Sequence, residues 1–148
     1  MTPGGPVFIP QIPQHEKTSL MSKPQLRWTT QGAASDFEAA RKYLSLLASD
    51  AKVDALVKAL RSTKLVDHAA KDLLRAAQLP LLPRDEPHVD ADLKRIHKGK
   101  PLAPILVVRG DFALRLPLVV ADGYHRICAV WYFDENAPVR CRIASSGR

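Results

Sequence analysis

Apolar residues in the segment 35–78 recur every three or four positions, the spacing of helices with one buried face. They form three stripes, which comprise Phe37, Ala40, Leu44 and Leu47; Val53, Leu56, Val57 and Leu60; and Leu65, Val66, Ala69, Leu73, Leu74 and Ala77. Ser35 and Glu38 have the S-x-x-E spacing of a capping box, which predicts that a helix begins there. Because Pro80 cannot continue a helix, we expect two or three helices to end before it.

From Leu79 onward the apolar pattern changes to short elements. Residues 79–82 are a brief strand candidate, and residues 105–108 and 116–120 are near-continuous apolar runs, typical of strands covered on both faces. A last strand is predicted near the C-terminus, where Val139, Cys141 and Ile143 alternate with Arg140 and Arg142.

Two further helices are predicted between these strands. Asp90 can cap the first, and Gly99 can end it in the left-handed conformation. The second follows Gly123 and ends near Asp134. The resulting order is β-α-β-β-α-β, so we expect an α+β domain with a small mixed sheet over residues 79–148, preceded by a helical extension.

The three predicted parts of the chain are a tail over residues 1–34, the helical extension over residues 35–78 and the α+β domain. The tail follows neither a helical nor an alternating period and holds five of the twelve prolines, so we expect it to be flexible. Its apolar members are suited to lie over the domain or a partner subunit. These are Val7, Phe8, Ile9 and Trp28.

The composition of the 148 residues, 46% hydrophobic and 25% charged, is that of a globular protein. No apolar run is close to the length of about 20 residues that a helix needs to span a bilayer. The N-terminus also lacks the pattern of a signal peptide, so we expect a cytoplasmic protein without a membrane partner. Cys128 and Cys141 are expected to be reduced and buried. The five histidines are scattered singly along the sequence, which disfavours zinc.

The net charge of +7 raises the possibility of a nucleic-acid partner, but the excess is spread along the chain and acidic residues are interspersed with it. The one local basic cluster comprises Lys94, Arg95, His97, Lys98 and Lys100.

The turn Asp122–Arg126, between a predicted strand and a predicted helix, is the main functional candidate. The first amides of a helix attract anions, and Gly123 lacks the Cβ that would block a close approach. Tyr124, His125 and Arg126 would complete a phosphate site, while Asp122 could hold Mg²⁺. The competing interpretation is structural: Asp and Gly are common at helix starts, and Arg126 could pair with Asp122 or Glu135.

The elements around this turn resemble the ParB N-terminal and sulfiredoxin-like superfamily. In that family a helix with a basic end leads through a proline into a strand, as residues 92–107 do here. A second strand then enters a turn of the Asp-Gly-His-His-Arg type, which reads Asp-Gly-Tyr-His-Arg at residues 122–126 and is followed by Ile127-Cys128-Ala129. The resemblance covers roughly residues 79–143, and it implies that a nucleotide binds at the turn.

Known members use the nucleotide as a switch in chromosome partitioning, for cysteine sulfinate repair, or for phosphoryl transfer to a small metabolite. Sulfiredoxins carry a catalytic cysteine immediately before the His-Arg pair, where this chain has Tyr124. Partitioning proteins continue into a helix-turn-helix region, whereas this sequence ends five residues after Ile143. Both activities are therefore disfavoured. The family also uses a second polar segment, which corresponds here to residues 84–86.

Three functions remain open from the sequence. The first is a nucleotide- or phosphate-binding domain that acts as a small phosphotransferase or nucleotide hydrolase, with ATP, ADP or CTP and Mg²⁺ as cofactors and His125 and Glu86, or Asp85, as catalytic candidates. The second is a nucleic-acid-binding or nuclease-like module that uses Lys94, Arg95, Lys98, Lys100, Arg140 and Arg142. The third is a non-catalytic interaction module, which binds a partner or a second copy through the helical extension and the tail.

Overall fold

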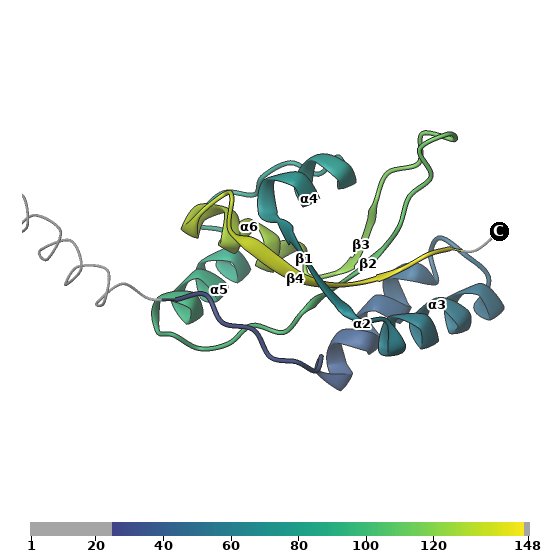
Figure 1. Ribbon diagram of the computed structural model, residues 1–148, viewed down its shortest axis with the longest axis horizontal. Coiled ribbons are helices and arrows are strands. Elements are labelled where there is room, and N and C mark those ends of the chain that lie inside the picture. Colours follow the sequence, from purple (N-terminus) through teal and green to yellow (C-terminus); the bar gives the residue numbers. More distant parts are fainter. Residues whose placement is uncertain (1–24, 147–148) are drawn as a thin grey trace, which may run out of the picture.

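The structure is a computed structural model that describes residues 25–146. In this part of the chain five helices surround a four-stranded sheet (Figure 1). The elements are α2 (Ala34–Leu44), α3 (Asp50–Ser62), β1 (Leu65–Ala69), α4 (Ala70–Ala77), α5 (Pro87–His97), β2 (Ile105–Val108), β3 (Val119–Asp122), α6 (Tyr124–Phe133) and β4 (Pro138–Ala144). Every helix in residues 25–146 is too short or too polar to cross a membrane.

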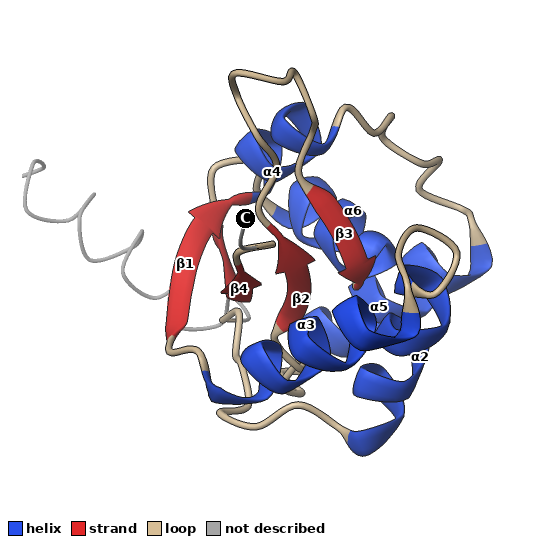
Figure 2. Ribbon diagram, turned by 90° about the vertical axis from the view of Figure 1, so that its right-hand side faces the viewer, coloured by secondary structure: helices blue, strands red, loops and turns tan. Residues whose placement is uncertain are grey.

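The sheet has the order β1-β4-β2-β3 (Figure 2). β4 runs antiparallel to β1 and parallel to β2, and β3 runs antiparallel to β2 with a register shift between Leu106 and Val107. The predicted α+β class with a small mixed sheet is therefore confirmed.

Both faces of the sheet are covered, which explains the unbroken apolar run of β2. Its residues Ile105 and Val107 belong to a core cluster with α4, α5 and α6, whereas Leu106 and Val108 belong to a second cluster with α2 and α3. Figure 1 shows these two groups of helices on opposite sides of the sheet. The buried stripes of α2 and α3 are thus used for internal packing.

The first strand of the sheet is not the predicted one. Residues 65–69, expected to begin a third helix, form β1 because they pair with β4 over their whole length, and α4 begins only at Ala70. Residues 79–82, expected to be a strand, form no regular element. The hydroxyl groups of Tyr124 and Tyr132 instead donate to the carbonyl oxygens of Pro80 and Leu82.

Several predicted element ends are also wrong. No described side chain caps α2, whose N-cap is Ala33, so the predicted Ser35 capping box does not form. The helix ends at Leu44, and the side chain of Leu47 is exposed. Glu86, not Asp90, caps α5, while Gly99 follows it with a positive φ of 73°, as expected. The strand predicted over residues 116–120 is displaced to residues 119–122.

The predicted tail falls mostly on residues 1–24, which lie outside the described residues, and so do Val7, Phe8 and Ile9. Trp28 forms a bridge with Leu102 and packs against the core beside α5 and α6. The two cysteines are free and buried, as expected, and burial raises the pKa of the Cys141 thiol to about 12.

Candidate functional site

The turn between β3 and α6 depends on Gly123 for internal packing. Gly123 has a φ of 115°, and a Cβ at this position would lie 2.5 Å from Cγ2 of the buried Ile105. Both features exclude a larger residue. Gly123 is also the N-cap residue of α6, and no side chain of the described residues bonds to this helix end.

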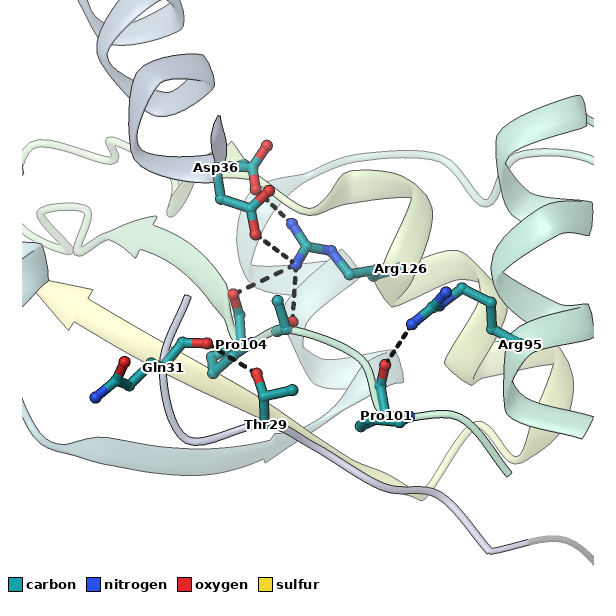
Figure 3. Close-up of polar contacts among 9 residues, drawn as sticks. Thr29, Gln31, Asp36, Arg95, Pro101, Pro104 and Arg126 are labelled. Atoms are coloured by element: carbon teal, nitrogen blue, oxygen red, sulfur yellow. Dashed lines mark hydrogen bonds and ion pairs between the residues drawn. The ribbon is translucent and has the colours of Figure 1, made fainter. Parts of the chain in front are cut away.

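The guanidinium group of Arg126 is engaged with acceptors inside the protein. It donates to Asp122, to Asp36 of α2 at 3.2 Å and to the carbonyl oxygens of Ala103 and Pro104 at 2.8 and 3.5 Å. Figure 3 shows the guanidinium group between Asp36 and the loop that precedes β2. The Arg126 side chain is only 12% exposed. The ion pair with Asp122 is the structural alternative that the sequence left open. Arg126 therefore joins α6, α2 and β3.

Asp122, the predicted Mg²⁺ ligand, is turned toward this arginine. Burial raises the pKa of its carboxyl group, the positive charge of Arg126 opposes that shift, and the nearby Asp36 adds to it. Asp122 and Arg126 thus form a half-buried ion-pair network with Asp36, in which each charge has a partner.

A different group of side chains lies at the first turn of α6 and faces solvent. Glu86, His88 and His125 each place one potential ligand atom within 4.8 Å of those of the other two. Oε2 of Glu86 is 3.2 Å from Nδ1 of His88 and 3.8 Å from Nε2 of His125. The two imidazole rings are tilted at 37°, with centroids 4.7 Å apart. We call these three residues the Glu-His-His cluster.

The position of Glu86 follows from its role in helix capping. Its Oε1 accepts hydrogen bonds of 2.8 Å from the amides of both His88 and Val89, which leaves Oε2 for the two imidazoles. The Val89 amide lowers the pKa of the Glu86 carboxyl group, and His88 and the charge of His125 lower it further, against a smaller effect of burial. The carboxylate is therefore ionised at neutral pH and fixed in orientation.

Asp92 lies one helical turn after His88 on α5 and interacts with the same cluster. Burial raises the pKa of its carboxyl group, whereas Arg126, His125, Arg95 and His88 lower it through their charges. Asp85, the other carboxylate predicted in this region, is exposed in the turn before α5.

The structure thus brings together Glu86 and His125, which the sequence predicted separately, and adds His88 and Asp92, which it did not predict. The only sequence signal for His88 is the Glu-Pro-His run at residues 86–88, where a capping glutamate places the histidine beside its own carboxylate. The contact with His125 crosses from α5 to α6 and has no signature in sequence spacing.

Most of the basic residues considered for nucleic-acid binding contact acceptors within the chain. Lys94 pairs with Asp90 at 3.0 Å, and Arg140 pairs with Asp67 at 3.2 Å. Arg95 donates to the carbonyl oxygen of Pro101 (Figure 3), and Arg142 donates to those of Thr63 and Thr30.

Comparisons of the chain with protein-family models, with curated proteins and with solved structures find no match.

Proposed function

We propose that the chain binds a nucleotide, or another phosphorylated small molecule, at the N-terminus of α6 and hydrolyses or transfers a phosphoryl group there. One observation carries this proposal: the Glu-His-His cluster lies at the first turn of a helix that no described side chain caps and that has no acidic residue in that turn. Free amides and the positive end of the helix dipole attract phosphate, and the cluster adds groups that can move a proton.

His125 and Glu86 are the proposed catalytic residues. His125 belongs to the same helical turn as the amides, so its ring can donate a hydrogen bond to a phosphate oxygen held there. Glu86 is ionised and oriented by two amides, so Oε2 can accept a proton from an attacking water or hydroxyl group. Phosphoryl transfer depends mainly on such positioning and on electrostatic stabilisation.

Arg126 and Asp122 take a positioning role in this proposal. Their side chains bond to each other and hold the turn against α2. Mg²⁺ prefers oxygen ligands, keeps several of its waters and binds the phosphates of a nucleotide together with one or two carboxylates. We therefore propose that Mg²⁺ enters with the nucleotide and does not depend on Asp122.

The resemblance to the ParB N-terminal and sulfiredoxin-like superfamily supports the same location for the nucleotide. The small mixed sheet and the strand, glycine turn and helix over residues 119–133 are compatible with membership, which we propose on that basis. Because one fold hosts many reactions, the proposed chemistry depends on the cluster and not on this resemblance.

A thermal-shift titration tests the proposal. ATP, ADP and CTP, each with Mg²⁺, and inorganic phosphate are added to the full chain at increasing concentration. We expect at least one nucleotide to raise Tm progressively, because a ligand that binds only the folded state stabilises it.

Two histidine variants make the test specific to the site. His125→Ala should remove most of the Tm shift, whereas His68→Ala, on an exposed position of β1, should keep it. Arg126→Ala is unsuitable, because it removes a partner from two carboxylates and two carbonyl groups. A flat response to every nucleotide, or an equal loss in both variants, would contradict the proposal.

A further inference from the structure

We propose that Oε2 of Glu86, Nδ1 of His88 and Nε2 of His125 bind a divalent transition-metal ion of the zinc type. Metal binding itself does not rest on the proposed nucleotide function. The donor set is two imidazole nitrogens and one carboxylate oxygen, a combination that suits zinc and neighbouring transition metals, whereas Mg²⁺ takes oxygen ligands.

The spacing of the donor atoms fits one shared ion. Bonds of about 2.0–2.1 Å in a tetrahedral site place two ligand atoms roughly 3.3 Å apart. The two separations that involve Oε2 of Glu86 are 3.2 and 3.8 Å, on either side of that value. One nitrogen of each ring lies within 4.8 Å of one nitrogen of the other ring, and rotation of the exposed rings can shorten this separation.

The charges at the cluster favour a cation between the rings. A single carboxylate oxygen faces two imidazoles, whose ring centroids are only 4.7 Å apart. Each imidazole ring offers a nitrogen lone pair and the carboxylate oxygen offers another, so one ion can bind all three groups.

The surroundings hold the ligands in place and leave them accessible. The amides of His88 and Val89 fix the Glu86 carboxylate, and Asp92 is close enough to interact with both imidazoles. A carboxylate near metal-binding histidines stabilises a bound cation through its charge. His88 and His125 are 73% and 43% exposed, so an ion can reach them from solvent.

Three protein ligands leave at least one coordination position open, as in catalytic zinc sites. The cluster lies at the first turn of α6, where the phosphate is proposed to bind, and a metal there would polarise a phosphate oxygen or activate water. This consequence, unlike metal binding, does rest on the proposed function. With an ion bound, Oε2 of Glu86 would be a ligand and no longer the proton acceptor, and the ion would instead activate the attacking water.

The test is a titration of the untagged full chain with Co²⁺ or Zn²⁺ and no nucleotide. Isothermal calorimetry with Zn²⁺ should give one site per chain, and Co²⁺ should give visible absorption bands of a site with nitrogen and oxygen ligands. Failure of nucleotide binding would leave this result unaffected, so the two proposals can be separated.

Variants assign the ion to the cluster. His88→Ala and His125→Ala should each weaken Zn²⁺ binding by more than the roughly 10–100-fold that loss of a supporting partner costs, and Asp92→Asn should fall within that range. His97→Ala, near the C-terminal end of α5, should bind as the wild type does. The two cluster substitutions are at exposed side chains, and circular dichroism will verify that both variants fold.

Three results would overturn the proposal. The first is a wild-type chain that binds neither ion at equimolar concentration. The second is undiminished binding in both His88→Ala and His125→Ala. The third is a near-ultraviolet cobalt–thiolate band, which would assign the ion to Cys128 or Cys141.

Discussion

At the scale of single residues, Gly123 shows how the turn before α6 is constrained from inside the fold. Its φ of 115° is strained for any side chain, and an added Cβ would lie 2.5 Å from Cγ2 and 2.7 Å from Cβ of Ile105. A residue without a side chain would favour phosphate binding here, but the packing of β2 against the turn already requires glycine at this position.

Gly123→Ala should lower the free energy of unfolding by about 2–4 kcal/mol, the combined cost of backbone strain and overpacking. Gly99→Ala is a matched control, because Gly99 also has a positive φ, of 73°, but nothing lies within 4 Å of the position that its Cβ would take. It should cost only about 1–2 kcal/mol of strain. Urea denaturation measures both, and an equal loss in the two variants would contradict the packing argument.

Ionisation of the Asp92 carboxyl group costs folding free energy because the group is partly buried. A role beside the proposed metal site would explain why an acidic residue stands there. A carboxyl group whose pKa is raised on folding contributes stability below its ordinary pKa of 3.8 and loses that contribution as the pH rises through the raised value. Asp92→Asn does not titrate, so it should gain stability relative to the wild type between about pH 4 and pH 7.

Chemical denaturation of the two proteins at several pH values in this range measures the difference. We expect the variant to be the more stable protein at pH 7 and the advantage to shrink on acidification. A constant difference across the range would show that burial does not raise the pKa of Asp92.

At the scale of elements, the segment between α4 and α5 sets the position of Glu86. The hydroxyl groups of Tyr124 and Tyr132 of α6 donate to the carbonyl oxygens of Pro80 and Leu82 at 2.5 and 2.7 Å. Both bonds tie the segment that ends at Glu86 to the helix that carries His125. These bonds therefore help to hold Glu86 and His88 beside His125.

Tyr132→Phe should lower the free energy of unfolding by about 1 kcal/mol, because it leaves the Leu82 carbonyl without its donor. Tyr43→Phe, at an exposed position of α2, should change it little. Thermal or urea denaturation measures the free energy of unfolding of both variants. Equal stabilities would contradict the structural role of the Tyr132 hydroxyl group.

The sequence predicts some elements better than others. Elements whose pattern lies within a short window are predicted well, and those that depend on contacts with distant residues are not. β2, α3, α6 and β4 follow from runs and stripes of apolar residues that are visible in short windows. Residues 65–69 have apolar positions that fit a helical stripe, and only their pairing with β4 makes them a strand. Residues 79–82 are apolar enough for a strand, but their carbonyl groups are used by tyrosine hydroxyls and not by a neighbouring strand.

The same distinction applies to the site. The turn Asp122–Arg126 is contiguous, so the sequence locates it, and the ion pair of Arg126 with Asp122 is one of the pairings that it suggests. The contact of Arg126 with Asp36 spans 90 positions, and the contact of His125 with Glu86 joins two helices. Neither has a signature that a single sequence can show.

At the scale of the whole molecule, the sheet separates a structural side from the proposed functional side. α2 and α3 cover one face, and Asp36 of α2 reaches Arg126 at the turn. The other face carries α5 and α6, whose N-terminal regions meet at the Glu-His-His cluster. The arginine network thus anchors the turn on the side of α2, while the two histidines of the cluster are exposed to solvent.

Nuclear magnetic resonance of the ¹⁵N-labelled full chain, titrated with ATP or ADP and Mg²⁺, tests the central claim most directly. If phosphate binds at the N-terminus of α6, the amide signals of Tyr124, His125 and Arg126 should shift most and saturate at one ligand per chain. Unchanged signals at these three residues, or shifts concentrated instead at Lys98 and Lys100 beyond the end of α5, would contradict it.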